Sequence, residues 1–168
     1  MDSSSLLREL YGRLAPLVHA CVDGVDMDRL REPPPAAHNP IAWLVWHVAR
    51  IQDHHISEIL DEQQIWILGT WADQFGLEPD PSNTGYGHRS DDVARVRPVG
   101  RDALLGYFDQ VEARTEAFLA TVTDGDLDRV VDRRWVPPVT LGVRLVSVAD
   151  DSLQHLGQAA YLRGMLTA

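Results

Sequence analysis

The chain has 168 residues, a formal net charge of −10, 45% hydrophobic residues and 24% charged residues. This length suits one compact domain with a single core, expected over residues 1–168, and the acidic balance argues against binding to nucleic acid or to an anionic membrane surface. Cys21 is the only cysteine, which excludes an internal disulfide and a zinc site built from several cysteines.

The first predicted helix covers residues 3–22, with Pro16 as the expected position of a kink or an early end. Its apolar residues recur at helical spacing: Leu6, Leu7, Leu10, Leu14, Leu17, Val18 and Cys21. The chain begins MDSSSLLREL, without a basic segment before an apolar run, and it contains no stretch of about 20 apolar residues. We therefore expect a cytoplasmic protein. Residues 23–38 are predicted to be a linker that ends in a proline run.

The second predicted helix covers residues 40–61, with Asn39 as N-cap and Pro40 in the first helical position. Its expected buried arc is Ile41, Leu44, Val45, Val48, Ile51, His55, Ile56 and Ile59. His47 lies at the rim of that arc, beside Trp43. A histidine at the edge of a buried face can reach a site between helices.

Residues 62–98 are the least regular part of the sequence. Trp66, Trp71 and Phe75 are spaced for one or two short helices, the segment PDPSNTGYGH has the composition of a loop, and residues 91–96 fit one helical turn. A loop of this length in a small domain usually covers a site or is mobile.

Two further helices are predicted at residues 101–123 and 140–166, separated by an extended segment at Trp135–Pro138. The last helix should bury Leu141, Leu145, Val148, Ala149, Ser152, Leu156 and Ala159. Four long helices without a strand pattern predict an all-α fold, an antiparallel four-helix bundle with a long crossover between the second and third helices.

The last helix also contains two candidate metal ligands. Asp151 and His155 are four residues apart, so both side chains lie on one face and can bind one metal ion, while Asp150 should point away. His47 is the best third ligand, and two histidines with one carboxylate would leave a fourth position open. The alternative is a simple Asp151–His155 contact without a metal, which is the more common meaning of such a pair.

Two other histidines have more than one interpretation. His55 lies within the apolar arc and is interpreted as a core histidine or as a partner that supports the ligands. His88, in the segment GYGHR, could face the site from the long loop.

The sequence resembles the DinB-like (YfiT-like) superfamily, and in particular its actinobacterial branch. The similarity lies in NPIAWLVWHVARIQDHHISEIL, WADQFGLEPDPSNTGYGH and SVADDSLQHLGQAAYLRGML, and it extends over nearly the whole chain. It implies a divalent metal, zinc or nickel, held by three side chains that fall on His47, Asp151 and His155. The family's middle ligand is a histidine, whereas this chain has Asp151, a carboxylate that can bind zinc but makes the metal a weaker Lewis acid.

The resemblance implies a metal-dependent transferase that uses a low-molecular-weight thiol such as mycothiol against a small electrophile. Arg144 is predicted to orient Asp151 or to hold a carboxylate of the thiol, and Gln158 to support His155. Trp43 and Trp46 beside the buried arc suggest a homodimer. The competing hypothesis is a non-catalytic bundle that serves as a dimer or partner scaffold with a degenerate metal site.

Overall fold

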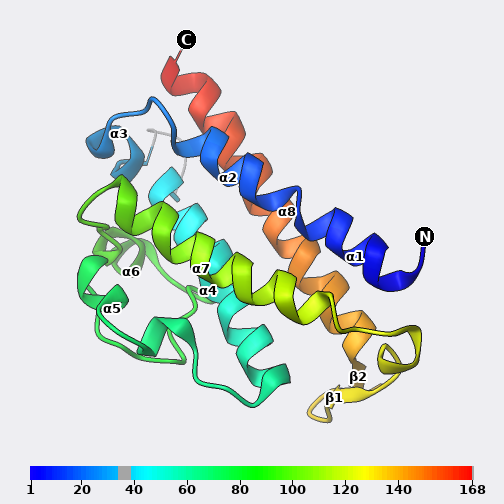
Figure 1. Ribbon diagram of the computed structural model, residues 1–168. Coiled ribbons are helices and arrows are strands. Elements are labelled where there is room, and N and C mark those ends of the chain that lie inside the picture. The colour runs from blue at the N-terminus through cyan, green and yellow to red at the C-terminus, as the bar shows by residue number, and fades with distance from the viewer. Residues whose placement is uncertain (34–38, 168) are drawn as a thin grey trace.

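The computed structural model describes residues 1–33 and 39–167, and most of this part of the chain is helical (Figure 1). The helices are α1 (Ser3–Tyr11), α2 (Leu14–Val22), α3 (Met27–Arg31), α4 (Ile41–Leu60), α5 (Trp71–Gln74), α6 (Ser90–Arg95), α7 (Arg101–Leu119) and α8 (Leu141–Thr167), with 3-10 turns η1 (Ile65–Ile67) and η2 (Asp124–Asp126). Strands β1 (Val130–Asp132) and β2 (Val139–Thr140) form a small antiparallel hairpin. The predicted all-α fold class is confirmed, and residues 34–38 of the predicted linker lie outside the described residues.

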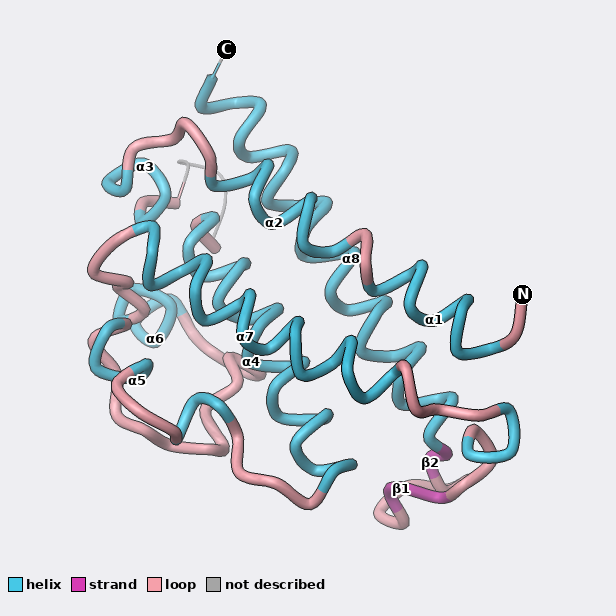
Figure 2. Tube along the Cα trace, in the orientation of Figure 1, coloured by secondary structure: helices cyan, strands magenta, loops and turns pink. Residues whose placement is uncertain are grey.

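The long helices pack around one apolar core. Helices α4 and α2 each contact both α7 and α8, and α1 extends the line of α2 along α7. Figure 1 shows α4 and α7 running in the same general direction and α2 and α8 running in the opposite one. The segment between α4 and α7 must therefore return along the bundle, as predicted for a crossover. In Figure 2 this segment is seen as loops interrupted by short helices beside α4.

The first helix differs from its prediction. It breaks between Tyr11 and Leu14, and Pro16 lies within the first turn of α2, where its missing N–H would have no intrahelical partner. Leu6 and Leu17, which were expected to face inward, are 59% and 39% exposed. The predicted linker also contains a helix, α3.

Helix α4 is buried on more sides than its apolar arc predicts. Every residue from Ile41 to Arg50 is buried, including Trp43 and Trp46. The reason is the crossover, which covers the second face of the helix: Trp66 of η1 packs edge-on against Trp46. Because both tryptophans are buried, they cannot provide the surface on which the predicted homodimer was based. The helix also begins at Ile41 with Pro40 as N-cap and no side-chain cap bond, so the predicted Asn39 cap is wrong.

Helix α8 and the segment before it complete the frame of the site. All seven residues of the predicted α8 face are buried. The hairpin was not predicted, because two strands of three and two residues show no alternation that a sequence pattern can reveal. It brings the buried Asp132 close to the start of α8. Among the described helices, none combines the length and the apolar character needed to cross a bilayer.

Candidate metal centre

His47 reaches the space between α4 and α8 with a fixed ring orientation. Its side chain is 5% exposed, its ring stacks on Trp43 at a centroid distance of 4.8 Å, and Nδ1 lies 2.6 Å from the carbonyl oxygen of Thr84. A carbonyl only accepts hydrogen bonds, so Nδ1 must carry the proton and donate it. The lone pair of Nε2 is then directed at α8.

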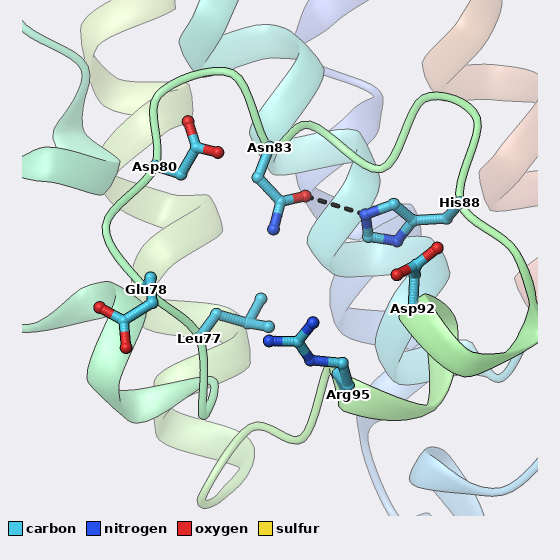
Figure 3. Close-up of a pocket in the computed structure, with 7 residues that line it drawn as sticks. All are labelled: Leu77, Glu78, Asp80, Asn83, His88, Asp92 and Arg95. Atoms are coloured by element: carbon cyan, nitrogen blue, oxygen red, sulfur yellow. Dashed lines mark hydrogen bonds between the residues drawn. The ribbon is translucent and has the colours of Figure 1, made fainter.

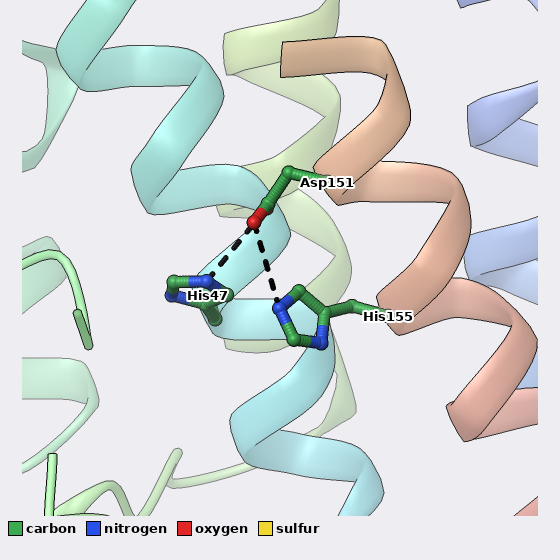
Figure 4. A group of neighbouring side chains, drawn as sticks. All are labelled: His47, Asp151 and His155. Atoms are coloured by element: carbon green, nitrogen blue, oxygen red, sulfur yellow. Dashed lines mark ion pairs between the residues drawn. The ribbon is translucent and has the colours of Figure 1, made fainter. Parts of the chain in front are cut away.

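Asp151 and His155 meet His47 from α8, as Figure 4 shows. Nε2 of His47 lies 3.7 Å from Oδ2 of Asp151, and Nε2 of His155 lies 3.6 Å from Oδ1 of the same carboxylate. Nδ1 of His155 is 3.1 Å from Oε1 of Gln158, to which it donates. Both imidazoles therefore present an unprotonated Nε2 to one carboxylate. The exposed Asp150 accepts a hydrogen bond from Gln154 instead and points away from this group.

The three groups have the spacing of a metal-binding site. One ligand atom from each of the three residues lies within 4.8 Å of the others, and Oδ2 of Asp151 is buried without a hydrogen-bond partner among the described residues. Ligand atoms bound at about 2.0–2.2 Å to a tetrahedral zinc lie about 3.3–3.6 Å apart. The observed contacts between the two histidines and the carboxylate are close to this spacing, so the residues fit a divalent metal.

The charge state of Asp151 suits the same role. Burial raises the pKa of its carboxyl group, but when the histidine rings are protonated, the hydrogen bond and charge of His47 and the charge of His155 outweigh burial, and the net pKa then lies below the ordinary value. Asp151 is therefore a carboxylate at neutral pH. Its negative charge attracts a metal ion, while the histidines supply neutral nitrogen ligands.

A second group, His54, His55 and Glu58, also has the spacing of metal ligands. Here the surroundings argue against a cation. One guanidinium nitrogen of Arg144 lies 3.1 and 3.2 Å from the two ring nitrogens of His55, and Arg134 is 3.4 Å from Glu58. A metal at this group would have to displace or face two fixed positive charges.

The neutral state of His55 has a consequence for stability at low pH. Burial and the adjacent Arg144 lower its pKa from 6.5 to about 3, so the unfolded chain takes up a proton between these values that the folded chain does not. Stability from this group is complete above pH 6.5 and is lost as pH falls, by about 1.4 kcal/mol per pH unit at most. Between pH 6 and pH 5 we expect the free energy of unfolding to fall by about 1 kcal/mol less in His55→Gln than in the wild type. Urea unfolding of both proteins in the presence of a chelator measures this difference. Parallel curves for the two proteins would contradict this assignment.

The predicted supporting residues occupy distinct places. Gln158 accepts the hydrogen bond from His155, as described above. Arg144 donates to Asp132 at 2.8 Å in addition to contacting His55, and among the described residues it makes no hydrogen bond to Asp151. The hairpin thus holds Arg144 against His55 of the second histidine group. Hydrogen bonds from Arg134, aided by Arg144, lower the pKa of Asp132 and keep it charged.

His88 lies on the far side of Trp43 and is not part of the metal group. Nε1 of Trp43 donates to Nδ1 of His88 at 3.2 Å, and Nε2 of His88 donates to Asn83 at 2.9 Å, which fixes a neutral ring. Burial lowers the pKa of His88. His88 also forms one wall of a polar pocket of about 250 Å³, shown in Figure 3. This pocket is lined by Leu77, Glu78, Asp80, Asn83, His88, Asp92 and Arg95, and it does not include the metal group.

Sequence reasoning missed the loop that supports His47. A Cβ atom placed on Gly85 would lie 2.7 Å from Nδ1 of His47 and 3.0 Å from the rings of Trp43 and Trp46, and the backbone at Gly85 has φ +93°. Only glycine allows this approach. The sequence signal was the tight G-Y-G turn, but the partner of such a turn cannot be read from local sequence.

We expect Gly85→Ala to destabilise the protein more than Gly87→Ala. Both positions have positive φ, but nothing lies within 4 Å of a Cβ at Gly87. Gly87→Ala should therefore cost about 1–2 kcal/mol from backbone strain alone, and Gly85→Ala about 1–3 kcal/mol more from overpacking against His47. Urea unfolding of the two variants measures the difference. Equal losses would mean that the loop moves aside without resistance.

Comparison with known proteins supports this description of the fold. A crystal structure described as the conserved protein of locus from Enterococcus faecalis is similar, with a TM-score of 0.88 and 29% sequence identity over 97% of this chain and 96% of that chain. A search of curated proteins finds no match. The family model for mycothiol-S-transferase matches residues 7–168, as the resemblance in the sequence predicted. The chain thus belongs to the mycothiol-S-transferase family.

Proposed function

We propose that the protein is a divalent-metal-dependent transferase that joins a low-molecular-weight thiol, mycothiol or a close relative, to a small electrophile in the cytoplasm. The observation that carries the proposal is the convergence of two unprotonated Nε2 atoms, from His47 and His155, on the buried carboxylate of Asp151. Zinc or nickel suits this set of two imidazoles and one carboxylate.

The three side chains would hold the metal and leave one position for the thiol. His47 is 5% exposed, whereas Asp151 and His155 are 33% and 20% exposed, so access is from their side of the site. A divalent metal bound there would lower the pKa of a thiol ligand, as it lowers that of water, and so supply a thiolate at neutral pH. In the overall reaction the thiol loses its proton, a sulfur–carbon bond forms, and the electrophile releases its leaving group with the bonding electrons.

The residues around the metal group have separate tasks in this proposal. Thr84 and Gln158 hold the two imidazoles in the tautomer that binds a metal. Trp43, stacked on His47 and edge-on to His155, excludes water from one side of the site. Arg144 is held by its ion pair with Asp132 and contacts His55, so it has no assigned task at the metal.

The test is a transfer assay with purified protein, mycothiol and a fluorogenic alkylating electrophile. We expect zinc- or nickel-loaded protein to form the thioether, chelated protein to lose this activity, and added metal to restore it. His155→Ala should stay inactive after metal is added, while His54→Ala, a matched change in the second histidine group, should respond like the wild type. Transfer that is indifferent to chelation and to His155→Ala would overturn the metal-dependent mechanism. A protein that binds no metal and transfers no thiol would favour the non-catalytic scaffold instead.

A homodimer is also proposed, but its original basis in Trp43 and Trp46 is wrong because both are buried. Sedimentation at micromolar concentration tests it: a monomer would contradict the proposal.

A further inference from the structure

We infer that Arg50 is a positioning residue for His47, because it holds residues 81–84 in the place from which the carbonyl of Thr84 selects the metal-binding tautomer. We call residues 81–84 the clamp loop. This inference rests on the proposed function in one respect only, that His47 is a metal ligand.

The contacts of Arg50 lead directly to the clamp loop. Its side chain is fully buried, Nε donates to the carbonyl of Asn83 at 2.9 Å, and Nη2 donates to the carbonyl of Pro81 at 3.1 Å. The next carbonyl along the chain, that of Thr84, accepts the proton from His47. Arg50 and His47 are three residues apart on α4, so they lie on one face of the helix and hold consecutive parts of the same loop.

The guanidinium is itself held on its other sides. Nη2 also donates to Oε1 of Gln64 at 2.9 Å, Nη1 donates to the hydroxyl of Tyr107 at 3.2 Å, and Nη1 lies 3.5 Å from Asp53. Its plane lies over the ring of Trp66, 4.9 Å from the centroid. A planar fork can direct several N–H groups at fixed carbonyls, whereas a lysine ammonium has three donors on a single atom and cannot reach the same set.

Two acceptors compete for the proton of the neutral His47 ring. The carbonyl of Thr84 favours the proton on Nδ1, while the unpaired Oδ2 of Asp151, 3.7 Å from Nε2, favours the proton on Nε2. A proton on Nε2 would occupy the position that a metal must take. By fixing the clamp loop, Arg50 keeps the Thr84 carbonyl within hydrogen-bonding distance of Nδ1, and so stabilises the tautomer with the proton on Nδ1.

The experiment compares Arg50→Lys with Arg114→Lys in the otherwise intact chain. Arg114 is a matched control because it also donates to a loop carbonyl, that of Gln63, and to Ser57, and also lies 3.8 Å from Asp53, but among the described residues it makes no hydrogen bond to the clamp loop. Two readouts are taken: the tautomer of His47 in the metal-free protein, from its ring nitrogen shifts by NMR, and zinc affinity by calorimetry. We expect Arg50→Lys to shift the ring toward protonation on Nε2 and to weaken zinc binding about 10–100-fold, the usual effect of losing a partner that orients a ligand. Arg114→Lys should leave both unchanged.

An unchanged tautomer and unchanged zinc affinity in folded Arg50→Lys would overturn the inference while leaving the proposed function standing. A tautomer shift in a protein whose wild type binds no zinc would support the positioning role and reject the metal. If Arg50→Lys fails to fold, Gln64→Leu tests the positioning role instead, because the Gln64 amide hydrogen-bonds to both Arg50 and the carbonyl of Pro81. It should shift the tautomer in the same direction by a smaller amount, and no shift would overturn the inference.

Discussion

Replacing Asp53 with alanine is expected to lower the free energy of unfolding by about 3–5 kcal/mol, the range for removing one partner of a buried ion pair. The carboxylate of Asp53 is 1% exposed and accepts from the backbone N–H groups of Ile65 and Trp66 and from the hydroxyl of Tyr107. Its loss would leave the fully buried Arg50 without its nearest counter-charge and two buried N–H groups without an acceptor. These contacts join α4 to η1 and so fix the start of the crossover.

Urea unfolding in the presence of a chelator measures this effect without a contribution from metal. Asp150→Ala is the matched control, because Asp150 is exposed and accepts a hydrogen bond from Gln154 on the same helix. We expect this control to change stability by less than about 0.5 kcal/mol. A loss below about 1 kcal/mol for Asp53→Ala would show that the crossover does not depend on its carboxylate.

Replacing His155 with alanine is expected to weaken zinc binding by more than about 100-fold, since removal of a ligand should exceed the 10–100-fold effect of removing a supporting partner. The fold should survive, because His155 is 20% exposed, its hydrogen bond is to Gln158 one turn along the same helix, and alanine favours a helix. Calorimetric titration of zinc into the chelated protein gives the affinity, and circular dichroism checks the fold.

The control for this experiment is His54→Ala, which removes a histidine from the second group while leaving the first intact. It should bind zinc as the wild type does. If His54→Ala weakened zinc binding and His155→Ala did not, the metal would lie at His54, His55 and Glu58, against the positive charges of Arg134 and Arg144.

The helices were predictable because their periodicity is a local property of the sequence. The buried face of α8 was predicted residue by residue, since one side of this helix faces the core and the other faces solvent. Helix α4 was predicted in its length but not in its burial. Its second face, with Trp46 and Arg50, is covered by the crossover. The residue pattern within a helix does not indicate which other segments of the chain will pack against it.

In the candidate site, too, local features were predictable from the sequence and long-range contacts were not. The spacing of Asp151 and His155 and the place of His47 on its helix are local features, and the structure brings the three residues together. Thr84, Gly85 and the role of Arg50 were not predicted. They act through backbone carbonyls and close packing in a loop, and such contacts depend on how the crossover folds onto α4 rather than on residue type.

Anomalous X-ray diffraction from crystals grown with zinc tests the central claim most directly. The account predicts a peak at about 2.0–2.2 Å from Nε2 of His47, Nε2 of His155 and a carboxylate oxygen of Asp151, with the Nδ1 contact between His47 and Thr84 retained. No peak between α4 and α8, or a peak only at His54, His55 and Glu58, would contradict it.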